Sequence, residues 1–177
     1  SRNMVKTRLL FLLMFAGAVQ AEPVEDPSQQ ARPDWPLVIL QLRQQLDQWP
    51  GRVATRKQLA VAYNNYAVSL AQTGHLAEAR EQLDQAIRID PTNAEFRKNL
   101  ALIYLQEAQL AYQARRTTDA KTALELALEI NPDEATAYAL LGEIEYNSQQ
   151  LKQAKAAWEK AIAINPKNSW AHNAIAI

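Results

Sequence analysis

Large and small apolar residues alternate most regularly between Ala135 and Pro166. Small residues stand at Gly142, Ala154 and Ala161, where two antiparallel helices can cross closely. Large apolar residues fill the space between the close crossings. They are Tyr138, Leu141, Trp158 and Ile164. Because proline lacks an N–H group and disfavours helical geometry in the residue before it, Pro166 ends the second helix. The pattern predicts a helix-turn-helix unit.

The same pattern occurs in two upstream segments, Ala60–Pro91 and Ala101–Pro132. The matching residues of the first are Tyr63, Ala67, Gly74, Leu76, Ala79, Leu83, Ala86 and Asp90-Pro91. Those of the second are Tyr104, Ala108, Ala120, Leu124, Ala127 and Asn131-Pro132. Three units in one phase resemble the tetratricopeptide repeat (TPR), which has aromatic, Leu-Gly, Ala, aromatic, Ala and Pro positions at these offsets. The resemblance implies an all-α fold, a right-handed α-solenoid of helix-turn-helix repeats.

Two of the repeats are longer than the third. The closing prolines stand at positions 50, 91, 132 and 166, so the intervals are 41, 41 and 34 residues. Since the last interval is the family's repeat length, the first two repeats carry seven extra residues before their first helices. Seven residues keep the inner face of a helix in phase to about 20°. We therefore expect first helices about 10 Å longer than usual, over roughly 53–72 and 94–115. The repeats are expected at 53–91, 94–132 and 135–166.

The turn inside the second repeat departs from the pattern of the first. Arg115-Arg116-Thr117 replaces Gly74-His75-Leu76, so no glycine is present at the end of the first helix. We expect a looser turn here. Thr118 has a side chain suited to an N-cap, and we expect it to cap the following helix.

Shorter segments flank the three repeats. Glu22–Pro36 holds four of the eight prolines, which predicts an extended leader over residues 22–35. Leu37–Gln48 has an apolar helical face, so residues 36–50 are expected to form an amino-terminal capping helix. Residues 169–177 begin a further helix. It is either a carboxy-terminal cap or the start of more protein beyond Ile177, and we favour the second because two turns are too short to be stable.

The first 21 residues have the pattern of a secretory signal. Arg2, Lys6 and Arg8 precede the apolar run Leu9–Val19, and no acidic residue occurs before Glu22. These features predict a signal peptide over residues 1–21, cleaved after Ala21, and a periplasmic or secreted protein. The apolar run is shorter than the about 20 residues that span a membrane. An uncleaved membrane anchor is the alternative.

Composition narrows the possible functions. Hydrophobic residues make up 48% of the chain and charged residues 21%, which suits packed helices. No cysteine is present, which excludes disulfides, thiolate metal sites and cysteine catalysis. The 19 basic and 19 acidic residues balance, and removal of residues 1–21 leaves a mild acidic excess. Because it lacks a basic stripe, the chain is not expected to bind nucleic acid.

The sequence offers little for catalysis. His75 falls in a turn, His172 falls at the start of the last helix, and neither has a partner at zinc-ligand spacing. No Gly-rich loop follows a strand, and no nucleophile elbow occurs. We therefore expect a protein that is not an enzyme and that uses no metal and no cofactor.

The resemblance also implies a binding groove, because in TPR proteins the first helices line a concave groove that holds an extended or helical peptide. Carried onto this chain, the groove residues are Asn64, Asn65, Gln72, Leu105, Gln106, Gln109, Tyr112, Gln113, Glu143, Tyr146 and Asn147. The basic residues with which some members clamp a terminal carboxylate are missing, so that mode is disfavoured. Lys57 and Lys98, one in each helix extension, are either solvated helix ends or a basic lip for an acidic ligand. Tyr112 and Tyr146 occupy equivalent places and are candidates for an aromatic ladder.

Three hypotheses of function follow. The first is a non-catalytic scaffold of the cell envelope, of the exported bacterial type, that binds a protein or peptide partner in its groove. The second is that these repeats precede the catalytic part of a longer exported enzyme, because extended repeats of this kind look like those that precede metallopeptidase-like domains. The third is self-association through the carboxy-terminal face.

Overall fold

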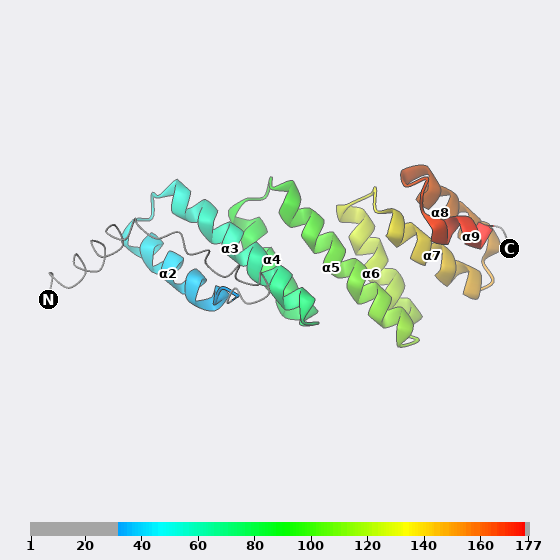
Figure 1. The fold of residues 1–177 in the computed structure, drawn as a ribbon, viewed down its shortest axis with the longest axis horizontal. Coiled ribbons are helices and arrows are strands. Elements are labelled where there is room, and N and C mark those ends of the chain that lie inside the picture. Colours follow the sequence, from blue (N-terminus) through cyan, green and yellow to red (C-terminus); the bar gives the residue numbers. More distant parts are fainter. Residues whose placement is uncertain (1–31, 176–177) are drawn as a thin grey trace, which may run out of the picture. The chain divides into compact units, whose positions relative to one another are not determined.

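The computed structural model describes residues 32–175, and the secondary structure of this range is helical. The helices are α2 (Trp35–Gln48), α3 (Val53–Gln72), α4 (Leu76–Ile89), α5 (Ala94–Gln113), α6 (Thr117–Ile130), α7 (Ala135–Asn147), α8 (Leu151–Ile164) and α9 (Ser169–Ile175). They are joined by short turns and follow one another in a row (Figure 1).

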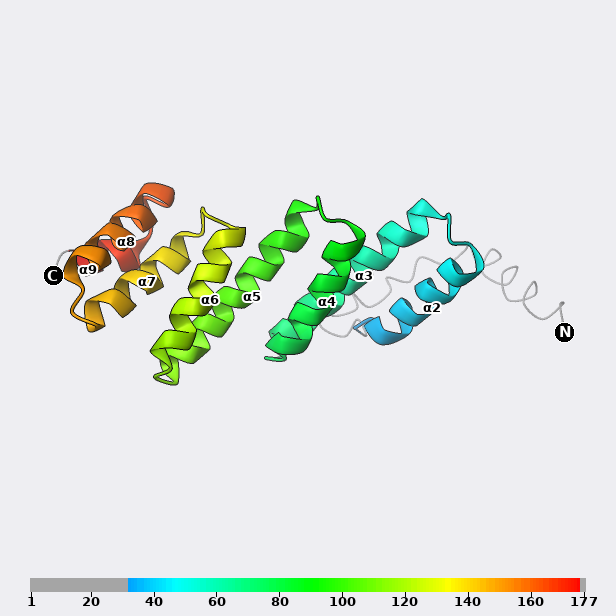
Figure 2. The same ribbon diagram turned by 180° about the vertical axis from the view of Figure 1, so that it is seen from behind.

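The helices pack as pairs. α3 with α4, α5 with α6 and α7 with α8 make the most extensive contacts, and each pair packs against the next through α4 with α5 and α6 with α7. α2 packs against α3, and α9 packs against α8. Figure 2 views the row from behind Figure 1, and α4 and α6 lie in front of α3 and α5 there. The fold is an α-solenoid of helix-turn-helix repeats, as the sequence pattern predicts.

The first helices of the first two repeats are lengthened. α3 and α5 contain 20 residues each, whereas α7 contains 13. The second helices α4, α6 and α8 all contain 14 residues, so the extra length belongs to the first helices alone. α5 ends at Gln113, two residues before its expected end. At 1.5 Å per residue, seven extra residues add about 10 Å to each helix.

Small and large residues meet inside each pair. Ala67 in α3 is buried in the same apolar cluster as Leu83 in α4, and Ala108 in α5 is buried with Leu124 in α6. The third pair uses a smaller and a larger residue at the equivalent places. Its Gly142 faces Trp158, whose indole N–H donates to the backbone carbonyl of Ala139 at 3.2 Å. The alternation of sizes therefore forms the core as the sequence predicts.

The turn in the second repeat is as tight as the other two, so the expectation of a looser turn is wrong. The N–H groups of His75, Arg116 and Gln150 each donate to the carbonyl five residues earlier, at 2.8–2.9 Å. This bond closes the end of each first helix in a Schellman motif. The motif needs a left-handed residue, and Gly74, Arg115 and Gln149 have φ of 83°, 62° and 62°. Arg115 adopts the conformation that Gly74 adopts without strain.

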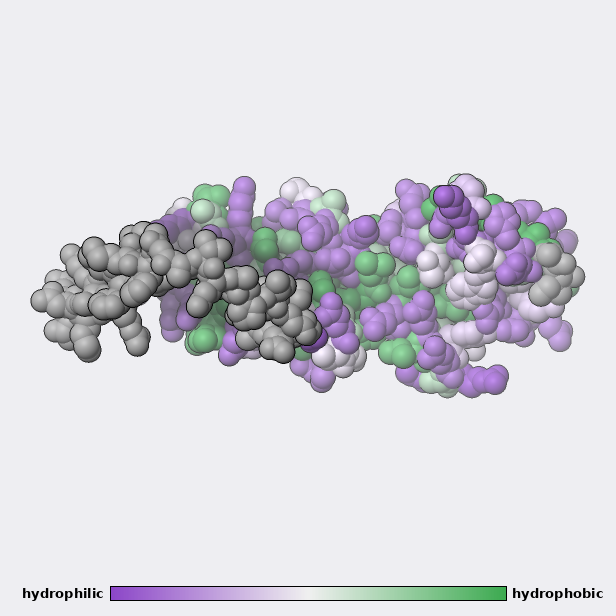
Figure 3. All heavy atoms as spheres, in the orientation of Figure 1, coloured by the Kyte–Doolittle hydropathy of each residue, from purple (hydrophilic) through white to green (hydrophobic). Residues whose placement is uncertain are grey.

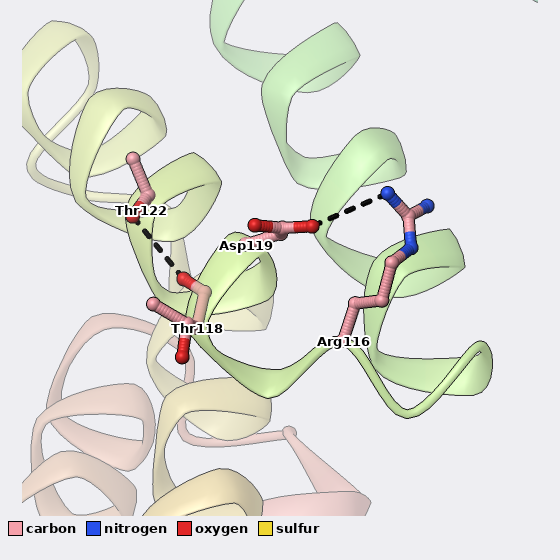
Figure 4. Close-up of polar contacts among 4 residues, drawn as sticks. All are labelled: Arg116, Thr118, Asp119 and Thr122. Carbon is pink, nitrogen blue, oxygen red and sulfur yellow. Dashed lines mark hydrogen bonds and ion pairs between the residues drawn. The ribbon is translucent and has the colours of Figure 1, made fainter.

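Thr118 does not cap α6, so that expectation is also wrong. The N-cap residue is Arg116, without a capping hydrogen bond from its side chain, and Thr118 lies inside the first turn. Figure 4 shows the arrangement: the Arg116 guanidinium pairs with Asp119 at 3.2 Å, and the Thr118 carbonyl accepts the Thr122 hydroxyl at 3.1 Å. An acidic residue in the first turn suits the positive end of a helix dipole, so Asp119 compensates in part for the missing cap.

The turns between repeats share a second local geometry. Asp90, Asn131 and Asn165 each precede a proline, and each side-chain oxygen accepts the N–H two residues later at 3.0–3.4 Å. An Asx side chain that bonds in this way stabilises a turn. The proline after it prevents the helix from continuing.

Several expectations concern residues at the chain ends. The predicted signal peptide, residues 1–21, and residues 22–31 of the predicted leader, 22–35, lie outside the described residues. Between residues 32 and 175, no helix is long and apolar enough to cross a membrane. α9 lies where a further helix was expected.

Candidate functional site

The groove residues expected from the sequence lie on α3, α5 and α7, but they differ in exposure. Exposed members are Lys57, Gln72, Lys98, Gln113, Tyr146 and Asn147. Half-buried members are Asn65, Gln106, Gln109, Tyr112 and Glu143. Asn64 and Leu105 are buried, with 3% and 7% of their surface exposed. These two side chains therefore offer little surface to a partner.

An apolar cleft of about 440 Å³ lies between α2 and α3. We call it the α2–α3 cleft, and it is lined by Trp35, Val38, Leu42, Lys57, Gln58, Val61, Ala62 and Asn65. Lys57 is the one charged residue in this lining. Val61 retains 46% of its surface exposed although it is aliphatic, so the floor of the cleft is open to solvent.

A second apolar cleft, of about 350 Å³, lies between α3 and α5. We call it the α3–α5 cleft, and it is lined by Val68, Ala71, Gln72, Asn99, Leu102, Ile103 and Gln106. Its lining contains no charged residue, and its polar members are all amides. Leu102 is 41% exposed. Figure 3, in the orientation of Figure 1, shows hydrophobic residues in green gathered near α5.

One face of α3 joins the two clefts. Lys57, Val61, Asn65, Val68 and Gln72 follow at intervals of four, four, three and four residues. Residues at these spacings lie above one another on a helix. The α2–α3 cleft is lined by Lys57, Val61 and Asn65. The α3–α5 cleft is lined by Val68 and Gln72. The face therefore runs from a cation, through aliphatic side chains, to an amide.

Amide side chains also bond between successive first helices. Asn99 of α5 donates to the buried Asn64 of α3 at 2.8 Å, and Asn64 donates to Asn65 at 3.3 Å. Gln106 of α5 donates to the carbonyl of Ala71 near the end of α3 at 3.5 Å. A buried amide needs such partners, because an unpaired one costs about 1–3 kcal/mol. Asn64 and Asn99 thus hold two repeats together.

Tyr112 connects the second repeat to the third. Its hydroxyl donates to Glu143 Oε1 at 3.0 Å and accepts a hydrogen bond from Asn147. Burial raises the pKa of the Tyr112 phenol above its ordinary value, and the hydrogen bond to the Glu143 carboxylate raises it further. Three of the expected groove residues therefore bond to one another.

Tyr146 packs elsewhere. Its ring lies against Trp158 with 5.7 Å between the ring centroids and a tilt of 41°. Tyr112 points its hydroxyl to α7, whereas Tyr146 packs on α8. The two rings have different neighbours, and the structure gives no ladder contact between them within residues 32–175.

The two basic candidates lie in the helix extensions. Lys57 and Lys98 are exposed, and neither takes part in an ion pair with another residue of the described range. The arginines before them are engaged: Arg56 donates to the carbonyl of Pro50 at 2.8 Å, and Arg97 donates to that of Thr92 at 3.4 Å. Each extension thus anchors its arginine to the preceding turn and leaves its lysine exposed.

The remaining candidate chemistry is local. His75 bonds to the Thr73 hydroxyl at 2.9 Å, and His172 bonds to the carbonyl of Pro166 at 2.8 Å. In the part of the chain that the structure describes, no group of three or more His, Asp or Glu side chains is placed to hold a metal ion. Both histidines therefore serve the turns in which they lie.

Sequence reasoning missed two contributors to the site. Trp35, Val38 and Leu42 of α2 line the first cleft, although this helix was expected only to cap the array. Their apolar spacing was visible, but it could not distinguish a cap from one wall of a cleft. Asn99 was missed because its partner, Asn64, lies 35 residues away.

Comparisons with known proteins agree with this architecture. A sequence model of the TPR repeat matches residues 69–107, and a model of the tetratricopeptide repeat matches residues 111–177. Together they match more than half of the chain. A comparison with curated proteins gave no match.

Solved structures of related architecture also match. The first TPR of Spaghetti (RPAP3) bound to an HSP90 peptide is 22% identical over 68% of this chain and 90% of its own, with a TM-score of 0.45. The Arabidopsis OM64 TPR domain is 18% identical over 68% and 94%, with a TM-score of 0.46. MamA is 25% identical over 80% and 75%, with a TM-score of 0.42.

Proposed function

The chain belongs to the tetratricopeptide repeat proteins, and we propose that it is a scaffold that binds a protein or peptide segment on the face formed by α3 and α5 and performs no chemistry. The observation that supports this most is the pair of apolar clefts on either side of the exposed face of α3. Apolar surface that faces solvent in two adjacent clefts suits the binding of another polypeptide.

The exposed aliphatic residues support an apolar contact. Val61 and Leu102 lie in different clefts and are 46% and 41% exposed, although each projects from the middle of a helix. Removing apolar surface from water contributes about 25 cal/mol per Å². A partner that placed one aliphatic side chain in each cleft would bury both residues.

The amides support backbone recognition. Gln72 is exposed at the edge of the α3–α5 cleft, and Asn65 lies half-buried in the α2–α3 cleft. An amide side chain can both donate to and accept from a peptide backbone. Gln106 of α5 lines the same cleft as Gln72 and donates to the Ala71 carbonyl of α3, which leaves its side-chain oxygen to accept. The surface therefore offers apolar contacts and hydrogen bonds in alternation.

Replacement of the aliphatic residues tests this function. We expect the double variant Val61→Ala and Leu102→Ala to capture a partner at least fivefold more weakly, because truncation of a central interface residue costs about 1 kcal/mol or more. Partners are captured from an extract of the source cells, identified by mass spectrometry, and measured again as purified proteins. Alanine favours a helix, so helical content and melting should not change.

A matched control separates binding from general surface effects. Leu126 in α6 is 37% exposed, similar to Leu102, but it lies on a second helix. Leu126→Ala should leave capture unchanged. Equal capture by the Val61/Leu102 variant and the wild type would rule out this face as the binding surface.

We also infer that the protein is exported and acts in the cell envelope. The support is the order of charged and apolar residues in the first 21 residues, with Arg2, Lys6 and Arg8 before the run Leu9–Val19. Mass spectrometry of the protein recovered from each compartment of its source cells measures whether residues 1–21 have been removed and where the protein is located. A chain that begins at Glu22 is expected, and a chain that retains its first 21 residues and stays in the cytosol would contradict export.

A further inference from the structure

We propose that the segment bound on this face is acidic and internal to the partner polypeptide, with its carboxylates on Lys57 and Lys98. This inference rests on the proposed function and specifies the partner. The two lysines are not among the groove positions of the common repeat pattern, because they lie in the seven-residue helix extensions. We call Lys57 and Lys98 the basic lip.

On α3 and α5 together, basic residues outnumber acidic residues. α3 contains no Asp or Glu, and its two charged residues are Arg56 and Lys57. Lys57 is the one charged side chain that lines either cleft. The first turns of α5 contain Arg97 and Lys98 against Glu95. A partner segment on this face therefore meets an excess of positive charge, although residues 22–177 together carry an acidic excess.

Two basic residues of the second helices are used differently. Arg80 of α4 pairs with Glu107 at 2.9 Å, and Lys121 of α6 pairs with Glu145 at 2.8 Å. These pairs join one repeat to the next. Lys57 and Lys98 have no such partner among residues 32–175. Their charges remain available to an external carboxylate.

Each lysine is held at the edge of the face by its helix. Arg56 and Arg97 bond back to the carbonyls of Pro50 and Thr92, so each extension engages its arginine in the preceding turn. Lys57 and Lys98 follow these arginines directly and stand at equivalent positions of successive repeats. Each lysine stands four residues before an exposed aliphatic residue of its own helix, Val61 or Leu102.

The position of the lip favours an internal segment over a chain end. A terminal carboxylate is one anion and is bound best by several donors that converge on it. Here the two cations belong to different helices, α3 and α5, and each is followed four residues later by an exposed aliphatic residue, Val61 or Leu102. The third repeat adds no cation to the row, because α7 begins at Ala135 and lacks the extension. The arrangement suits a series of acidic side chains along one side of a peptide.

Selection from a library of random peptides tests the proposal without a known partner. The full chain is immobilised, phage that display random twelve-residue peptides are selected on it, and the enriched peptides are synthesised with an amidated carboxyl end. We expect enrichment of peptides that combine Asp or Glu with aliphatic residues. The double variant Lys57→Gln and Lys98→Gln should bind them roughly tenfold more weakly, as expected for two exposed charge pairs.

Salt dependence and a charge-matched control show whether the lost lysine charges cause the weaker binding of the Lys57→Gln and Lys98→Gln variant. Affinity for the wild type should fall as NaCl is raised from 50 to 300 mM, and this dependence should be weaker in the lip variant, because salt screens exposed charges. Lys152 in α8 and Lys167 after it are exposed and lie outside the first helices. The variant Lys152→Gln and Lys167→Gln has the same net charge and should bind like the wild type.

The outcomes distinguish this proposal from the function on which it rests. Enrichment of neutral or basic peptides, or equal binding by the lip variant, overturns the acidic partner. If those peptides still lose binding in the Val61→Ala and Leu102→Ala variant, the proposed function survives. Binding that requires a free carboxyl end overturns the internal segment. A selection that enriches no peptide contradicts both proposals.

Discussion

Gly142 in α7 lies tightly against Trp158 in α8, and replacement of the glycine tests how the core is specified. A Cβ atom on residue 142 would lie 2.8 Å from Trp158 Cε2 and closer still to Nε1 and Cδ1. The indole cannot move away freely. It is 6% exposed, and its N–H donates to the carbonyl of Ala139.

Two opposing effects set the magnitude for Gly142→Ala. Alanine favours a helix interior over glycine by about 1 kcal/mol, whereas overpacking a tight core costs about 1–3 kcal/mol. Because the three atoms belong to a rigid buried ring and all lie under 3 Å from the added Cβ, we place the overpacking cost in the upper part of its range, at about 2–3 kcal/mol. After the helix preference of about 1 kcal/mol is subtracted, the free energy of unfolding should fall by about 1–2 kcal/mol.

The other repeats indicate how the loss can be reversed. They place Ala67 with Leu83 and Ala108 with Leu124 where the third repeat places Gly142 with Trp158. Trp158→Leu alone should leave a cavity and cost about 2–4 kcal/mol. In the double variant, which combines Gly142→Ala with Trp158→Leu, the added methyl group occupies space that the indole vacates. The double variant should be more stable than the sum of the single changes predicts, by about 1 kcal/mol or more.

Urea unfolding at 25 °C, followed by circular dichroism at 222 nm, measures the four members of this cycle. Gly51→Ala is the control, because no atom lies within 4 Å of a Cβ at that position. It should shift the midpoint little. A Gly142→Ala variant as stable as the wild type would refute the reasoning. So would additivity of the two changes to within about 0.5 kcal/mol.

Two further predictions concern single side chains. Arg115→Gly and Gln149→Gly should each raise the free energy of unfolding by roughly 0.5–1 kcal/mol, because glycine adopts the left-handed conformation without strain. Urea midpoints measure this change, and Gly74→Ala, which should lower the midpoint, is the opposite control. A loss of stability in both glycine variants would contradict the prediction. The raised pKa of the Tyr112 phenol means that folding favours the protonated phenol. The stability that this phenol contributes is therefore fully present below its unfolded pKa of about 10 and is lost as the pH rises through the folded pKa. Wild type should therefore lose stability more steeply than Tyr112→Phe between pH 9 and 11.5 in urea titrations, and parallel curves would disprove the role of its bond to Glu143.

The fold could be predicted from the sequence because its repeats constrain one another. A single pair such as Ala108 and Leu124 is uninformative, but the same size pattern in three segments closed by Asx-Pro fixes the phase of all three. Helix lengths followed from the spacing of those prolines. The repeat pattern depends on residue volume, which sets how closely helices pack, and on proline, which ends a helix. Both effects are the same in each repeat.

The turns could not be predicted in the same way. Arg115 has no intrinsic preference for the left-handed region, and Thr118 has a side chain suited to an N-cap. The structure places Arg115 in that region and Thr118 inside the helix. Packing of α5 against α6 fixes where both helices end, and this outweighs a local preference of about 1 kcal/mol.

The candidate site remains a prediction carried over from the repeat pattern, and the contacts of its residues could not be predicted. The expected residues lie on α3, α5 and α7, because the helical period is the same in each repeat. Which amides are exposed depends on a neighbouring repeat: Asn64 is buried because Asn99 covers it and bonds to it, and Tyr112 is half-buried because Glu143 and Asn147 meet its hydroxyl. Such contacts join residues 31–35 positions apart, and no pattern within one helix reveals them.

The helix extensions give the face its charge. Lys57 lies above Val61 and Asn65 because the three residues follow at intervals of four on α3. Lys98 stands four residues before Leu102 on α5 in the same way. The extensions therefore add one cation to the end of each aliphatic row. A longer helix that served stability alone would need the buried residues Leu59 and Leu100 of each extension, but it would not need a lysine at the same place in both.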